Sequence, residues 1–143
     1  MANATMDRFG FPATLVKEFE HWAVLLRPTQ VTLGSLVLAA KSEMTAYSAL
    51  PDAAFAEQAL AVRAIETALM DFVGYDKINY LMLMMVDPHV HFHVVPRYAG
   101  SRKWSGREFP DTGWPGPPDL KSAVLLDERQ ITALVDELRP RFG

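Results

Sequence analysis

The sequence contains no cysteine among its 143 residues. This absence excludes disulfide bonds, thiolate metal sites and a cysteine nucleophile, and it fits the reducing cytoplasm in which we expect this protein to work. Long apolar runs are also missing, because the most apolar stretch, residues 78–86, is far too short to cross a bilayer as a helix. Residues 1–8 include no apolar run, so we expect no secretory signal and no membrane partner.

A strong excess of positive or negative charge is missing as well. The net charge is −3, with acidic and basic residues mixed along the chain. A polymer of phosphates usually selects a stronger basic bias, so the composition disfavours DNA or RNA as a partner. Half of the residues are hydrophobic and 22% are charged, which is typical of a globular protein. We therefore expect residues 1–143 to form a single domain.

The pattern of apolar residues predicts an antiparallel sheet of about five strands. Short connections in the first third of the chain favour a meander. The expected strands cover residues 14–18, 21–26, 35–40, 78–86 and 89–96. Asp87 and Pro88 separate the last two strands, and the earlier of these is expected to be buried on both faces.

Two helices are expected in addition. Pro51 and Gly74 bound a segment of helical periodicity whose predicted apolar stripe is Phe55, Val62, Ile65, Leu69 and Phe72. A C-terminal helix is predicted over residues 127–139, ending before Pro140, with Ile131, Leu134, Val135 and Leu138 on its apolar side. Between sheet and final helix, residues 98–120 are rich in Pro, Gly, Trp and Arg and are expected to form a long loop. This order of elements predicts an α+β fold.

Three of the four histidines alternate along the last predicted strand, at positions 89, 91 and 93. Side chains alternate across a strand, so these three are expected to project from one face, roughly 6.6 Å apart. Val90, Phe92 and Val94 then face the core. Burying three imidazoles in a purely structural role is costly, since each ring has two nitrogens that need hydrogen-bond partners. The pattern therefore favours a functional site.

Two kinds of chemistry fit such a ridge. Imidazole binds zinc, iron and copper, and a carboxylate from Asp87, Glu108 or Asp111 would then complete a metal site. Imidazole is also a good neutral nucleophile near pH 7, and a covalent phosphohistidine divides one difficult displacement into two easier ones. The residues alone leave both open.

Residues 89–97 resemble the His-φ-His-φ-His-φ-φ signature of the histidine triad family, where φ is apolar. The trailing Pro96 and Arg97 are especially similar to the branch that includes fragile-histidine-triad proteins and bacterial dinucleoside polyphosphate hydrolases. Residues 22–28 and 34–38 look like the second and third strands of that family. The resemblance covers about residues 10 to 100.

The resemblance implies a nucleotide hydrolase or transferase that acts at the α-phosphate of a nucleoside phosphoramidate or a dinucleoside polyphosphate. His91 would attack phosphorus to give a nucleotidyl-histidine, His93 would assist the leaving group, and His89 would orient the site. The resemblance implies no cofactor and no metal in the protein, although the substrate can be a magnesium-nucleotide complex. It also implies a homodimer.

The sequence departs from the family at two points. Ser35 stands where many members carry a further histidine, and the connection before the triad is compressed to residues 86–88. These departures leave open a nucleotide-binding sensor with little turnover. Ser35, Asn79 and Arg97 are the expected substrate-binding residues. Arg97 begins a basic cluster with Arg102, Lys103 and Arg107, and Trp104 and Trp114 follow in the same segment.

Overall fold

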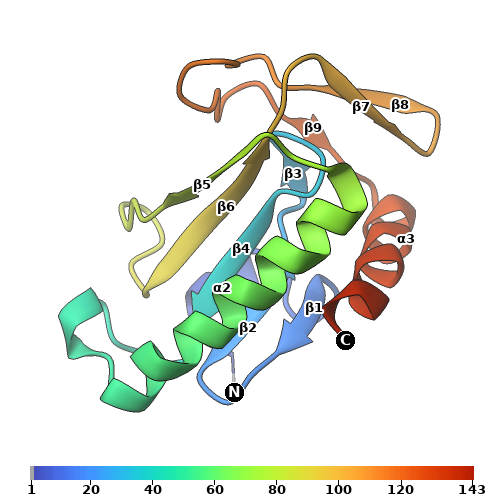
Figure 1. Cartoon of the computed structure of the whole chain (residues 1–143). Coiled ribbons are helices and arrows are strands. Elements are labelled where there is room, and N and C mark those ends of the chain that lie inside the picture. Colours follow the sequence, from blue (N-terminus) through green and yellow to red (C-terminus); the bar gives the residue numbers. More distant parts are fainter. Residues whose placement is uncertain (1) are drawn as a thin grey trace.

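A computed structural model describes residues 2–143. Its centre is a five-stranded sheet with the order β1-β2-β4-β6-β5, in which all neighbours are antiparallel (Figure 1). The strands are β1 Leu15–Glu18, β2 Trp22–Leu26, β4 Leu36–Ala40, β5 Lys77–Leu81 and β6 His91–Arg97. The predicted meander, the number of strands and the α+β class are confirmed.

The long helix α2, Asp52–Val73, covers one face of this sheet (Figure 1). Pro51 caps its start, and Gly74 ends it in the left-handed conformation that glycine adopts without penalty. Ile65 and Leu69 are buried as predicted, but Phe55 is 37% exposed and lies against Tyr47 instead. Half of the buried residues of α2 are alanines, namely Ala54, Ala61 and Ala68. Small side chains allow the helix to approach the sheet closely, and Trp22 Nε1 donates a hydrogen bond of 2.7 Å to the carbonyl of Ala54.

The C-terminal helix α3 runs Glu128–Leu138 and confirms the prediction. Asp127 and Gln130 form a reciprocal capping box at its start. Leu134, Val135 and Leu138 are buried as expected. A short 3-10 helix, η2 Arg139–Phe142, follows α3 and contacts α2 and β1. A second 3-10 turn, η1 Tyr47–Ala49, precedes α2.

The opposite face of the sheet is partly covered by a short helix, α1 Ala4–Arg8, which the sequence did not predict. Met6 is buried there against Ala23, Leu25, Val37 and Ala39. The side chain of Asn3 caps α1 and also donates to the carbonyls of Ala40 and Ser42, each at 2.9 Å. These contacts hold the N-terminal segment on the face that carries the histidines.

The strand predicted over residues 78–86 ends at Leu81, so this prediction was too long. Met84 has a φ of 49°, which an extended strand cannot contain. Residues 82–90 form an irregular connection, and within it Met85 is 83% exposed. The predicted compression to residues 86–88 is therefore wrong.

Residues 98–120 are not one long loop. They contain a hairpin of β7 Ser101–Trp104 and β8 Arg107–Pro110. Ser105 and Gly106 have φ of 51° and 76°, so both positions of the two-residue turn are left-handed, as hairpins prefer. Downstream, β9 Val124–Leu125 pairs with β3 Thr29–Gln30. Within the described residues, no helix is both long and apolar enough to span a membrane.

Candidate active site

Strand β6 places His91 and His93 on the sheet face opposite α2. The alternation is as predicted, because Phe92 packs against Trp22 on the α2 side while the two histidines face Phe9. The imidazole rings of His91 and His93 lie edge to face, with centroids 5.2 Å apart. Both rings are largely buried, with exposed fractions of 2% for His91 and 8% for His93.

The tautomer of His91 follows from one hydrogen bond. Its Nδ1 lies 2.7 Å from the carbonyl oxygen of His89. A carbonyl only accepts, so Nδ1 of His91 carries the proton. In the neutral ring the lone pair then resides on Nε2, which makes no hydrogen bond within residues 2–143. In this tautomer, a neutral His91 can act as a nucleophile through Nε2.

The surroundings keep His93 uncharged. Burial, followed by the charges of Arg27 and His91, lowers the pKa of His93 from 6.5 to about 4, against a smaller opposing effect of Asp87. Its Nδ1 is buried without a partner among the described residues. A buried N–H without an acceptor is costlier than an unpaired lone pair, so the proton of His93 belongs on Nε2. His93 can therefore donate a hydrogen bond from Nε2 into the site.

A pocket of about 270 Å³ opens over the two histidines. Its remaining lining comes from Phe9, Arg27 and residues 83–87. Arg27 is held by two hydrogen bonds of 2.7 Å from Nη1 to the carbonyl and hydroxyl oxygens of Thr29, while its Nε is buried without a partner. Burial lowers the pKa of Arg27, which stays charged nonetheless. A fixed guanidinium beside two imidazoles suits a phosphate oxygen.

Asp87 is the one acidic residue among those that line this pocket. Its Oδ1 lies 2.6 Å from Nε of Arg8, an ion pair whose angles fall outside those of a hydrogen bond. Because Arg8 offsets Asp87, the charge of Arg27 remains for an anionic ligand.

His89 does not share the predicted ridge, because β6 begins two residues later, at His91. The ring of His89 turns away from the pocket. Its Nδ1 lies 2.9 Å from Oγ1 of Thr5, and its Nε2 lies 3.2 Å from Glu43 Oε2. His89 thus attaches α1 to the connection before β6, while its carbonyl orients His91.

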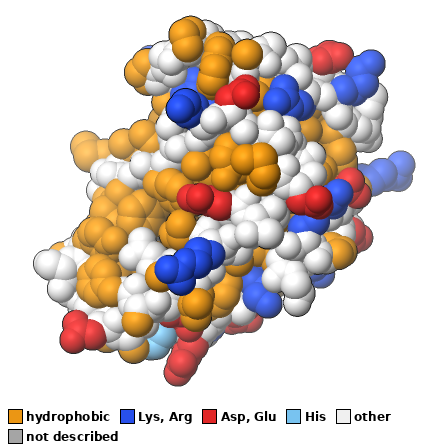
Figure 2. Space-filling model, in the orientation of Figure 1, with side chains coloured by type: hydrophobic (Ala, Val, Ile, Leu, Met, Phe, Trp, Pro, Cys, Tyr) orange, Lys and Arg blue, Asp and Glu red, His pale blue; other side chains and the backbone are white. Residues whose placement is uncertain are grey.

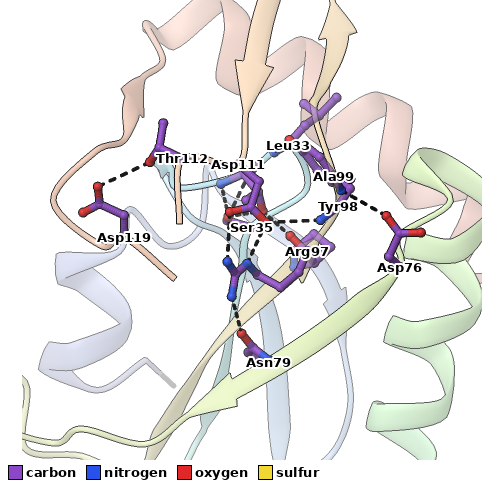
Figure 3. A network of polar contacts seen from close by, with 12 residues as sticks. Leu33, Ser35, Asp76, Asn79, Arg97, Tyr98, Ala99, Asp111, Thr112 and Asp119 are labelled. Carbon is purple, nitrogen blue, oxygen red and sulfur yellow. Dashed lines mark hydrogen bonds and ion pairs between the residues drawn. The ribbon is translucent and has the colours of Figure 1, made fainter. Parts of the chain in front are cut away.

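The three expected substrate-binding residues lie outside the histidine pocket. Ser35 is fully buried, and its hydroxyl donates to the carbonyl of Thr32 at 2.8 Å. Arg97 is 3% exposed and forms a paired contact with Asp111, with Nε to Oδ2 at 2.7 Å and Nη2 to Oδ1 at 3.0 Å (Figure 3). Its Nη1 donates to Asn79 Oδ1 at 2.8 Å. Ser35 is thus occupied within the fold, while Asn79 and Arg97 line a second cavity.

The sequence analysis missed Phe9 and Arg27 as pocket residues, and it named Asp87 only as a candidate metal ligand beside the histidines. Arg27 lies within residues 22–28, which the sequence analysis singled out, but nothing there indicates that its side chain meets the histidines. Phe9 has no sequence signal at all. Among the described residues, no group of three or more His, Cys, Asp or Glu side chains is placed to hold a metal ion, including Asp87, Glu108 and Asp111.

The arrangement of this site and sheet defines a fold class. A five-stranded antiparallel sheet with a long helix on one face and a histidine pair on the other is the fold of histidine triad proteins. No family sequence model matches the chain, and no curated protein sequence matches it. Solved structures, however, match it over nearly its whole length.

Three of these structures illustrate the likeness. A histidine triad protein from Bradyrhizobium japonicum superposes with a TM-score of 0.76 at 16% identity, covering 100% of this chain and 98% of that one. A histidine triad protein from Marinobacter aquaeolei VT8 gives 0.72 at 22% identity, with coverage of 95% and 93%. Diadenosine triphosphate hydrolase from Plasmodium falciparum gives 0.66 at 10% identity, with coverage of 90% and 76%. At these identities the likeness is one of fold, and the narrower resemblance to the fragile-histidine-triad branch stays a prediction.

Proposed function

We propose that this protein is a nucleotide hydrolase or transferase that cleaves at an α-phosphate through a nucleotidyl-His91 intermediate. The observation that carries the proposal is the hydrogen bond from His91 Nδ1 to the carbonyl of His89, which leaves the lone pair on Nε2. The fold, shared with a diadenosine triphosphate hydrolase, supports it.

The reaction has two steps. In the first, Nε2 of His91 attacks the α-phosphorus, a P–N bond forms, and the bond from phosphorus to the leaving group breaks. Nε2–H of His93 donates a hydrogen bond to the leaving group, which departs as a phosphate anion or takes its proton from water, and the guanidinium of Arg27 stabilises charge on the phosphate oxygens. In the second step water attacks phosphorus, the P–N bond breaks, the proton of the attacking water passes to solvent, and the nucleoside monophosphate leaves, so that free His91 is regenerated.

Two substrate classes suit this chemistry, namely nucleoside phosphoramidates and dinucleoside polyphosphates. In both, the leaving group gains negative charge or basicity as its bond to phosphorus breaks, and a hydrogen bond from Nε2–H of His93 stabilises it. A magnesium ion would enter with the phosphates of the substrate.

Intact-protein mass spectrometry tests the proposal. The protein is mixed briefly with diadenosine triphosphate or adenosine phosphoramidate and quenched without acid, as wild type, His91→Ala and His21→Ala. His21 is the matched control, since it is the histidine that lies outside residues 89–93. We expect one added adenylate in wild type and in His21→Ala, and none in His91→Ala.

Each other outcome has a definite meaning. An adduct on His91→Ala would show that another group is the nucleophile. Tight binding of AMP with neither adduct nor product would support the nucleotide-binding sensor. If activity disappears on treatment with a chelator in magnesium-free buffer and returns with zinc, the metal-dependent alternative would replace the covalent route.

The free edge of the sheet supports a homodimer as part of this proposal. β5 is an edge strand, and hydrophobic side chains gather beside it and along α2 (Figure 2). Exposed members include Phe55, Leu60, Met70, Leu83 and Met85. Unpaired edges and apolar patches are common at subunit interfaces. Light scattering is expected to give twice the monomer mass of 16.0 kDa, and a monomer mass at micromolar concentration would contradict the dimer.

A further inference from the structure

A second cavity, of about 390 Å³, lies on the same sheet face as the histidine pocket. Its floor is Lys77 and Asn79 of β5 and Arg97 of β6, and its other wall is residues 114–117. Lys77 is paired with Arg97 and Leu81 with His93 in the β5–β6 ladder, so these four side chains share one face. His93 and Arg97 are four residues apart on one strand, roughly 13 Å.

The wall over this floor is fixed by close packing. Asp111 accepts from Arg97 and also from the backbone N–H of Tyr98 at 3.1 Å, which pins the start of the segment (Figure 3). A Cβ at Gly113 would lie 2.3 Å from the carbonyl oxygen of Pro117 and 3.3 Å from Nη2 of Arg97. Only glycine fits there, so residues 113–117 close into a compact turn that presents Trp114 to the cavity.

The polar groups of the cavity select an anion with a planar part. Asp111 neutralises Arg97, each of whose three nitrogens donates one hydrogen bond to Asp111 or Asn79. Oδ1 of Asn79 accepts from Arg97, which turns its amide nitrogen to the other side, where it has no partner within residues 2–143. The ammonium group of Lys77 forms no ion pair or hydrogen bond with the described residues, and neither does Nε1 of Trp114. One ammonium, one free amide and one indole remain, with no uncompensated carboxylate among the lining residues.

We infer that this cavity binds the distal nucleotide of a dinucleoside polyphosphate whose α-phosphate lies at His91. Lys77 binds a phosphate oxygen, Trp114 stacks on the base, and the amide of Asn79 donates to the base or ribose. The partly exposed Leu81 lies between the two sites, so the polyphosphate bridge follows β5 from one to the other. The inference rests on the proposed function and favours the dinucleotide over the phosphoramidate as substrate, since a small amine leaving group would not reach the second cavity.

Calorimetric titration with diadenosine triphosphate and with AMP tests this assignment. The protein carries His91→Ala, so that the ligand is not consumed, and is compared with the same protein carrying Lys77→Ala, Trp114→Ala or Lys103→Ala. Lys103 is an exposed lysine on β7 and serves as the matched control. We expect Lys77→Ala and Trp114→Ala each to weaken the dinucleotide about tenfold more than AMP, the loss of one charge-assisted hydrogen bond or stack. Lys103→Ala should change neither.

The outcomes separate the two proposals. Equal effects of Lys77→Ala and Trp114→Ala on both ligands, or no binding of the dinucleotide, would overturn the second site, whatever the adduct experiment gives. An adduct on wild-type His91 together with equal effects would leave the proposed function standing alone. Selective loss of the dinucleotide without any adduct would support the second site and refute the covalent mechanism.

Discussion

The buried pair of Arg97 and Asp111 gives the most decisive test of the structure. Their side chains are 4% and 1% exposed, and Nε and Nη2 of Arg97 each donate to a different oxygen of Asp111. Asp111→Asn keeps the shape but removes the negative charge. Because the guanidinium cannot give up its proton, a buried positive charge remains without compensation.

The expected loss is large. Removing one partner of a buried ion pair costs about 3–5 kcal/mol, out of a total free energy of unfolding of about 5–15 kcal/mol. For a domain of this size, 1 kcal/mol corresponds to about 2–4 °C, so Tm should fall by about 6–20 °C. Urea unfolding followed by circular dichroism measures the change directly.

Two companion variants give this test its controls. Glu18→Gln breaks the exposed pair with Lys41, which spans 2.8 Å, and should cost less than about 1 kcal/mol. The double variant Arg97→Met, Asp111→Leu removes both charges and should recover most of the stability, since apolar residues of similar size often replace a buried pair without loss. If Asp111→Asn unfolds within about 1 kcal/mol of wild type, the pair is not buried as described and the reasoning fails.

Two further predictions follow from the two cavities. The folded pKa of His93, about 4, lies below its ordinary 6.5, so its contribution to stability is present at neutral pH and is lost as the pH falls from about 6.5 through about 4. Urea unfolding at about pH 7 and about pH 5 should show a decline that is smaller in His93→Asn, with at most about 2 kcal/mol arising from this group. Identical declines would count against a buried neutral His93. Gly113→Ala should destabilise the protein by about 1–3 kcal/mol, because the added Cβ would lie 2.3 Å from the carbonyl oxygen of Pro117. Gly116→Ala should cost less, because its Cβ would lie 3.3 Å from the carbonyl oxygen of Gly113. Equal losses of stability in the two variants would contradict the tight turn.

Local patterns in the sequence were sufficient for much of the fold. Alternation of apolar residues gave the strands of the first third, and helical periodicity with Pro51 and Gly74 gave the limits of α2. The placement of His91 and His93 on one face followed from the period of two along β6. These features depend on neighbours within a few residues, which is why one sequence suffices to predict them.

Other features depended on contacts between distant segments. The stripe of α2 was predicted to include Phe55, but close approach to the sheet favours Ala54 and its small neighbours instead. β5 ends at Leu81, where the irregular connection of residues 82–90 begins. The ring of His89 turns toward Thr5 of α1. Periodicity carries no information about such contacts between distant segments.

The sequence by itself determined the class of fold, the order of its elements and the pair of histidines that can carry the chemistry. Each of these follows from the spacing of residue types along the chain. Only the tertiary structure decided which groups surround that pair, namely Phe9, Arg27 and the carbonyl that fixes the tautomer of His91. It also decided that Asp111 pairs with Arg97 in the second cavity and that the ammonium group of Lys77 stays unpaired there. These groups meet because packing of the sheet, α1 and residues 111–117 brings together side chains far apart in sequence, and no local pattern specifies that packing.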